Sequence, residues 1–217
     1  MKFLKLFIVL LVAFSISCEK ADECPKEFTV FGKTLPYSDL YKKGDTIILS
    51  TEFSNMIYSK DLKKEFDFTK VELNFGFRIF RVDSPNTGYY SSATDYCNII
   101  RLDTLPFEVI HFSSGNSMLF GSIIIKKGIN SNSISIILTE AGTFMLSYGV
   151  FTNESIEDFQ NNCKGNTYDL STRLNNNKDN NINLLKESPN EHFNTWMIVE
   201  PNRFYYQKSG FAYRVVE

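Results

Sequence analysis

The chain has 217 residues, of which 43% are hydrophobic and 15% aromatic, and its formal net charge at pH 7 is −2. A near-neutral chain without a basic cluster lacks the electrostatic footprint of a nucleic-acid-binding protein, so we expect no nucleic-acid partner. The length suffices for one domain with a sizeable core or for two small ones. The 20 phenylalanines and 11 tyrosines favour strands over helices.

Residues 1–17 have the three parts of a secretory signal peptide. Lys2 and Lys5 make the first part basic, residues 6–14 are apolar, and small residues precede Cys18. The apolar run is too short to cross a bilayer, which takes roughly 20 such residues. We therefore expect export and cleavage. An ordinary signal with a chance cysteine near its end is the alternative to a lipoprotein signal.

A small residue and then Cys18, directly after the apolar core, resembles the bacterial lipobox, in which the thiol is acylated and becomes the new N-terminus. Ser15 departs from the aliphatic residue usual at its position. The polar residues that follow, within a predicted flexible tether at 18–26, resemble the start of surface lipoproteins of Bacteroidota-type bacteria. The resemblance implies a localisation: a lipid on Cys18 anchors the protein at the outer membrane or cell surface, so the membrane is its partner. It implies no activity.

Residues 27–217 are predicted to form a single, mainly β domain. The clearest strand is at 71–79, where apolar and polar residues alternate, which turns one face to the core and the other to water. Residues 54–70 look polar and mixed, with a helical turn around 61–66, and 83–97 look like a loop. Further strands are predicted at 27–33, 46–53, 106–112, 118–126, 133–138 and 210–216.

Residues 138–148 carry a second resemblance. Glu140 and then Ala-Gly142 lead into an alternating aromatic strand, which resembles the turn into the penultimate strand of immunoglobulin-like and fibronectin-like sandwiches. The resemblance implies an immunoglobulin-like β-sandwich, and another two-layer β arrangement is the alternative. We expect a helical and loop insertion at 153–209, before the last strand, with short helices at 156–162 and 181–187.

Three cysteines remain after lipidation, namely Cys24, Cys97 and Cys163. An exported chain can keep a disulfide, but spacing alone does not select the pair. We favour Cys97 with Cys163, because Cys24 lies in the predicted tether beside Pro25. A zinc site is disfavoured, because the cysteines are far apart and no histidine is near them.

The sequence offers little evidence of catalysis, so we expect no enzyme and no cofactor. It contains no GxSxG, HExxH or phosphate-binding motif. His111 lies in a strand-like run and His192 in a polar, helix-like one, without a partner pattern nearby, so a structural or surface role is favoured over a base. An uncharacterised hydrolase remains an alternative, and it needs one histidine beside an acid and a nucleophile.

An asparagine-rich tract at 175–183 invites comparison with a calcium loop. Asn175, Asn177 and Asp179 match the first three ligand positions of an EF-hand loop. Lys186 stands where a bidentate glutamate is required, so we expect a solvated loop and no metal site.

Two triplets, at 45–47 and 103–105, resemble the Asp-Ser/Thr-aliphatic sites at which Bacteroidota-type bacteria attach O-glycans. A turn aspartate that leads into a strand explains both equally well.

An aromatic platform for sugar rings is also conceivable, although aromatic residues in β proteins are more often core or cross-strand pairs. The platform would use Tyr89, Tyr90 and Trp196, with Tyr205 and Tyr206.

Two functions follow from the sequence as hypotheses. The first is a non-enzymatic envelope lipoprotein with a binding or assembly role and an unknown partner. The second is a glycan-binding accessory module of polysaccharide uptake.

Overall fold

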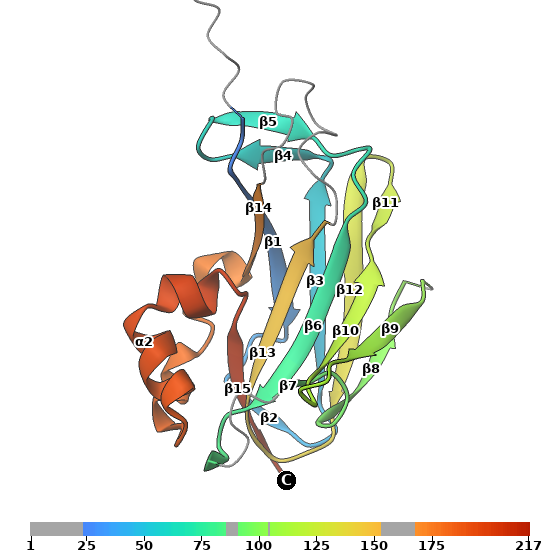
Figure 1. The fold of residues 1–217 in the computed structure, drawn as a ribbon. Helices are drawn as coiled ribbons and strands as arrows, with labels where there is room; N and C mark the ends of the chain where they lie inside the picture. The colour runs from blue at the N-terminus through green and yellow to red at the C-terminus, as the bar shows by residue number, and fades with distance from the viewer. Residues whose placement is uncertain (1–23, 86–90, 104, 153–167) are drawn as a thin grey trace, which may run out of the picture.

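The computed structural model describes residues 24–85, 91–103, 105–152 and 168–217. The predicted mainly β class is confirmed: two mixed sheets pack face to face as a sandwich (Figure 1). The signal peptide, Cys18, Tyr89, Tyr90 and Cys163 lie outside the described residues.

Sheet A has the strand order β11-β12-β3-β1-β4-β5, with β8 paired to β12 and β14 paired to β1. Most neighbours are antiparallel, and β14 runs parallel to β1. Its strands are β1 (Glu27–Leu35), β3 (Thr46–Ser54), β4 (Met56–Ser59), β5 (Lys64–Asp67), β8 (Cys97–Arg101), β11 (Ile124–Lys126), β12 (Ile129–Leu138) and β14 (Asp169–Leu174).

Sheet B has the order β2-β15-β13-β6-β10-β9, with β7 paired to β6. The aromatic strand β13, which is the second-to-last strand of sheet B in chain order, lies between β15 and β6, as the corresponding strand does in an immunoglobulin-like sandwich. The strands are β2 (Leu40–Lys42), β6 (Asn74–Arg81), β7 (Ser91–Ser92), β9 (Phe107–His111), β10 (Ser117–Ser122), β13 (Gly142–Phe151) and β15 (Phe211–Val216).

The core between the sheets is aromatic, as the composition suggests. Phe75 and Phe77 of β6 and Tyr148 of β13 are fully buried, and the rings of Phe75 and Tyr148 stack with centroids 6.0 Å apart. Each such burial stabilises the fold by about 1.5–3 kcal/mol relative to exposure. The alternation predicted at 71–79 is therefore confirmed on its inward face.

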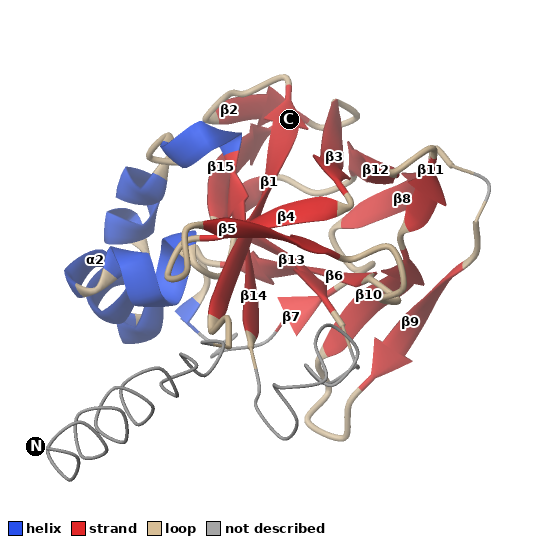
Figure 2. Ribbon diagram, turned by 90° about the horizontal axis from the view of Figure 1, so that it is seen from above, coloured by secondary structure: helices blue, strands red, loops and turns tan. Residues whose placement is uncertain are grey.

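The outward face of β6 differs from the prediction, because a helical segment covers part of it (Figure 2). Phe80 of β6 and Met145 of β13 pack against Phe193, Met197 and Tyr205 of that segment. Among the described residues, none of the helices is long and apolar enough to cross a membrane. The helical segment contains η3 (Asn175–Asn177), η4 (Ile182–Glu187), η5 (His192–Trp196), α2 (Met197–Val199) and η6 (Asn202–Tyr206).

Three predictions about local structure were wrong. A hairpin of β4 and β5 stands where a helical turn was expected, β8 lies at the end of the expected loop, and β14 lies inside the expected insertion. All four strands are short, and β4, β8 and β14 pair with strands far away in the sequence, which local propensity does not report. The helix expected at 156–162 lies outside the described residues.

The asparagine tract packs against strands of both sheets, and we call residues 175–183 the asparagine joint. The expectation of a solvated loop was wrong. The Asn175 side-chain oxygen accepts a bond of 2.8 Å from the Thr34 amide, and its amide nitrogen donates to Asn180. The Asn181 side chain donates to the carbonyls of Ser38 and Ala212. Asn175, Asn180 and Asn181 have φ of +58°, +51° and +59°, a left-handed conformation that asparagine tolerates better than most residues.

We expect Asn175→Ala to lower the free energy of unfolding by about 3 kcal/mol, because it removes the partner of a buried amide and places alanine at a left-handed position. Asn176→Ala is the matched control: Asn176 is exposed and has φ of +51°, so only the backbone cost of about 1 kcal/mol applies. Urea unfolding of both variants measures the difference. Equal destabilisation would contradict the role assigned to the buried amide.

The predicted Cys97–Cys163 disulfide was wrong, because Cys97 is a free, buried thiol at the start of β8. Its Sγ atom lies 3.6 Å from the carbonyl oxygen of Ala93, and burial raises the pKa of the thiol to about 12. Cys24 is disulfide-bonded, and its partner lies outside the described residues. The end of the predicted tether is also packed, since Pro25 is buried and the Lys26 carbonyl accepts a bond from the Asp169 amide.

We expect Cys97 to resist alkylation by iodoacetamide at pH 8 in the folded protein, because the thiol is buried and a pKa of about 12 leaves almost no thiolate. Full denaturation should expose it to complete labelling within the same reaction time. Peptide mass mapping reads both states. Rapid labelling of Cys97 under native conditions would contradict the burial.

Candidate functional site: a groove across sheet A

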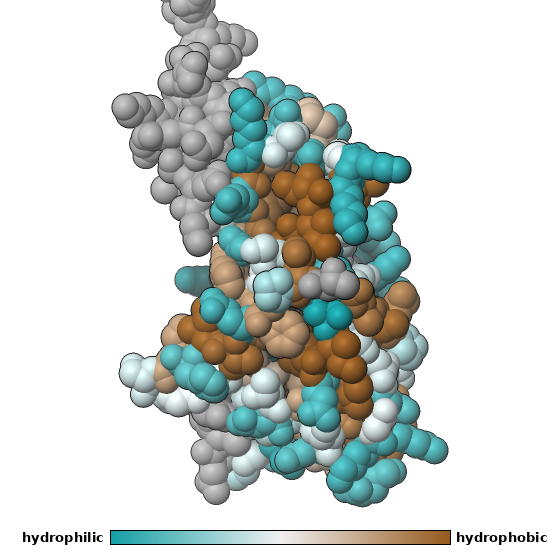
Figure 3. All heavy atoms as spheres, turned by 90° about the vertical axis from the view of Figure 1, so that its right-hand side faces the viewer, coloured by the Kyte–Doolittle hydropathy of each residue, from teal (hydrophilic) through white to brown (hydrophobic). Residues whose placement is uncertain are grey.

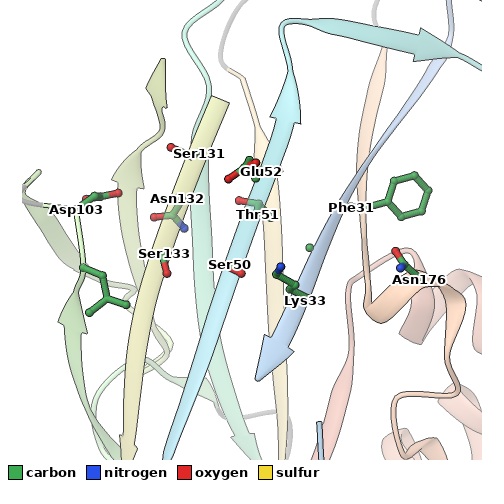
Figure 4. Close-up of a pocket in the computed structure, with 12 residues that line it drawn as sticks. Phe31, Lys33, Ser50, Thr51, Glu52, Asp103, Ser131, Asn132, Ser133 and Asn176 are labelled. Atoms are coloured by element: carbon green, nitrogen blue, oxygen red, sulfur yellow. The ribbon is translucent and has the colours of Figure 1, made fainter. Parts of the chain in front are cut away.

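The outer face of sheet A is hollowed into an open groove of about 620 Å³ (Figure 4). This volume lies within the range of small-molecule sites. Its floor follows from strand register: Lys33 of β1 pairs with Ser50 of β3, which pairs with Ser133 of β12. The next outward row pairs Glu52 with Ser131. Small serine side chains in the middle of the floor leave the hollow.

Taller side chains form the two sides of the groove. Phe31 of β1 is 46% exposed and stands with Asn176 on one side, and Leu102 and Asp103 stand on the other. Figure 4 shows Phe31 and Asn176 on the opposite side of the serine-lined strands from Asp103. The groove thus offers one exposed ring, several hydroxyls, an amide and charges of both signs.

A buried arginine holds the Asp103 side of the groove in place. The Arg101 guanidinium forms an ion pair with Asp103 and donates to the Pro106 carbonyl at 2.9 Å and to the Ser122 carbonyl. It also lies 5.1 Å from the ring centroid of Phe75. Because these contacts hold the Arg101 and Asp103 side chains in place, this wall of the groove is preorganised.

The inward residues beneath the floor form a buried polar network. The Tyr148 hydroxyl bonds with the Thr51 hydroxyl at 2.9 Å and accepts from the Asn132 amide at 3.2 Å. Burial raises the pKa of Tyr148 to about 12, so the phenol stays neutral. Since these residues point inward, strand alternation turns their neighbours Ser131 and Ser133 outward into the groove.

The groove adjoins an apolar edge of the sandwich. Figure 3, which views the side carrying β8, β9 and β11, shows apolar side chains gathered on this face. Leu102 belongs to both surfaces. Exposed apolar patches of this kind are typical of interaction sites. The exposed apolar residues on and beside these strands are Ile100, Leu102, Leu105, Phe107, Phe112, Ile125 and Ile129.

The aromatic residues predicted to bind sugars are not brought to the groove. Trp196 is 54% exposed, but it lies on the helical segment over sheet B, edge-on to Phe204. Tyr205 is fully buried. Phe31 and the serines of the floor were not predicted, although the alternating Ser131-x-Ser133 pattern was a signal for an exposed polar face.

The two histidines lie apart in the fold. His111 is exposed at the end of β9, and His192 is half-buried in η5, where burial lowers its pKa. Within the described ranges, no cluster of three or more histidine, cysteine, aspartate or glutamate side chains is placed to hold a metal. In the tract compared with a calcium loop, Asn175 is committed to Thr34, and Asp179 accepts a bond from the Tyr37 hydroxyl.

Of the two triplets that resemble glycosylation sites, 45–47 begins β3. The Asp45 carboxylate accepts a bond from the Lys42 amide, and Thr46 pairs with Ile137. Thr104 lies outside the described residues.

No family model and no curated protein matches the chain. Among solved structures, a human F-spondin reeler domain is similar with 14% identity and a TM-score of 0.32, over 66% of this chain and 90% of that one. A type II cohesin domain from the cellulosome of Acetivibrio cellulolyticus has 10% identity and a TM-score of 0.29, over 65% and 91%. Likenesses this remote say nothing about ligand or partner.

Proposed function

We propose that the protein is a non-enzymatic, lipid-anchored component of a bacterial cell envelope that acts by binding. The groove of sheet A carries the binding role: it has the size of a ligand site, preorganised walls and polar groups that converge on an open floor. The apolar edge beside it suits a protein partner in an assembly. Support for the anchor comes from Cys18, placed directly after the apolar run of the signal.

The anchor predicts a protein cut before Cys18 that carries acyl chains. Intact mass of the membrane-extracted protein should show both features. Cys18→Ala should lose the acyl mass and leave the outer-membrane fraction, because a single cysteine carries the lipid. Cys97→Ala is the matched control and should keep both. Unlipidated wild-type protein in the soluble fraction would refute the anchor without bearing on the groove.

A glycan is the second candidate for the ligand, favoured by the exposed Phe31 ring beside a floor of serine hydroxyls. Sugars present hydroxyls for hydrogen bonding and apolar C–H faces for contact with a ring. Lys33, Glu52 and Asp103 offer a donor and acceptors for those hydroxyls. This hypothesis replaces the predicted platform of Tyr89, Tyr90 and Trp196 with a different surface.

An oligosaccharide array probed with the purified protein tests this candidate. We expect Phe31→Ala to weaken binding by up to about tenfold, because a well-placed aromatic contact contributes on the order of 1 kcal/mol. Phe112→Ala, which removes a similarly exposed ring outside the groove, should leave binding unchanged. Absence of binding to every glycan, or equal loss in both variants, would refute the glycan hypothesis.

A further inference from the structure

The outer face of sheet B holds a second recess, at the margin of the helical segment and on the opposite sheet from the groove. It measures about 130 Å³ and adjoins a shallower hollow of about 230 Å³. Arg78 of β6, Ser147 of β13 and Lys208 line both. We call the smaller space, bordered by these three residues, the basic recess.

Two cationic side chains, those of Arg78 and Lys208, line this recess. Among the described residues, neither Arg78 nor Lys208 forms a salt bridge. Among the described residues, those that line the basic recess include no carboxylate, and Asp169 borders only the larger hollow. Four of the other five arginines, Arg81, Arg101, Arg203 and Arg214, each lie within salt-bridge distance of an aspartate or glutamate.

The fold holds the Arg78 side chain and the backbone of Lys208 in position. Arg78 is partly buried, and its guanidinium carbon lies 5.5 Å from the ring centroid of Phe80. The backbone of Lys208 is held from two sides: its carbonyl accepts a bond of 3.0 Å from the Ser147 hydroxyl, and Lys208 forms a parallel bridge with Thr172 of β14. Both side chains therefore border the same recess, and within the described residues neither is in a salt bridge.

Apolar walls strengthen the attraction that this recess exerts on an anion. Phe80, Met145, Met197 and Phe204 line it, and a less polar surrounding screens a charge pair less than water does. His192 also lines the recess, and because burial lowers its pKa the imidazole is neutral at pH 7. The net charge around the recess is thus that of Arg78 and Lys208.

We propose that the basic recess binds the anionic substituent of a small ligand, a carboxylate or a sulfate group. A guanidinium offers paired N–H donors that match the oxygens of such groups, and the lysine adds a point charge. Two cations on a chain of net charge −2 suit a singly charged group better than a polyanion. The recess admits one substituent, and the adjoining hollow accepts the part of the ligand next to it.

Amide NMR titration of the full chain in detergent, with chloride holding the ionic strength constant, tests the proposal. The probes are sodium methyl sulfate, whose anion carries one charge as a sulfate substituent does, and sodium D-glucuronate, and D-glucose is the neutral control. We expect saturable shifts at Ser147, Lys208 and Gly210 with at least one anion and none with glucose. Methyl sulfate and glucuronate separate the two anion chemistries, since preference for either identifies the group.

Variants separate this site from general charge effects. Arg78→Met should weaken binding at least tenfold and Lys208→Met at least threefold, whereas Arg78→Lys should retain part of the affinity. Arg203→Met removes an exposed charge on the same helical segment and should change nothing. Lys208 is exposed, so its variant tests the site even if an Arg78 variant unfolds. No saturable shift with either anion, or equal weakening by Arg203→Met, would overturn the proposal.

Discussion

The arrangement of the whole molecule depends on the left-handed asparagines that follow β14. Asn175 ties the turn to Thr34 of β1, Asn181 ties it to Ala212 of β15, and the Asn180 carbonyl accepts a bond from the Tyr205 hydroxyl. One short turn therefore joins both sheets and the helical segment. Asparagine suits these positions because it tolerates positive φ and because its amide satisfies buried backbone groups. The helical layer over sheet B is held by this joint.

Because the asparagine joint holds the helical segment over sheet B, the outer faces of the two sheets differ in how far they are covered. Sheet B is covered where Phe80 and Met145 meet the helical segment, and the basic recess exists because that cover ends beside Arg78. The groove of sheet A stays open, with small serines on its floor and the Arg101-supported wall beside it. The two surfaces differ in chemistry: the groove is polar with charges of both signs, and the basic recess has apolar walls and two cations that form no salt bridge with the described residues.

Strand positions followed from the sequence where alternation was strong, as at 46–53 and in the aromatic strand that became β13. The reading failed where conformation depends on distant partners. β14 is a strand because it pairs with β1, some 140 residues earlier, and Asn175 is buried because it meets Thr34. Cys97 was assigned to a disulfide because Cys24 lay in the predicted tether, but it is a free thiol buried in the core. The groove was missed because Lys33, Ser50 and Ser133 become a surface only through register.

The sequence by itself determined the inward face of each regular strand, because side-chain direction alternates with every residue whatever the strand packs against. It also carries the signal pattern and Cys18, from which the lipid anchor is proposed. Tertiary structure alone decided which outer face is covered, which cysteine stays free, and where polar and charged side chains converge. These outcomes depend on contacts between residues far apart in the chain, and a local pattern contains no information about the distant partner.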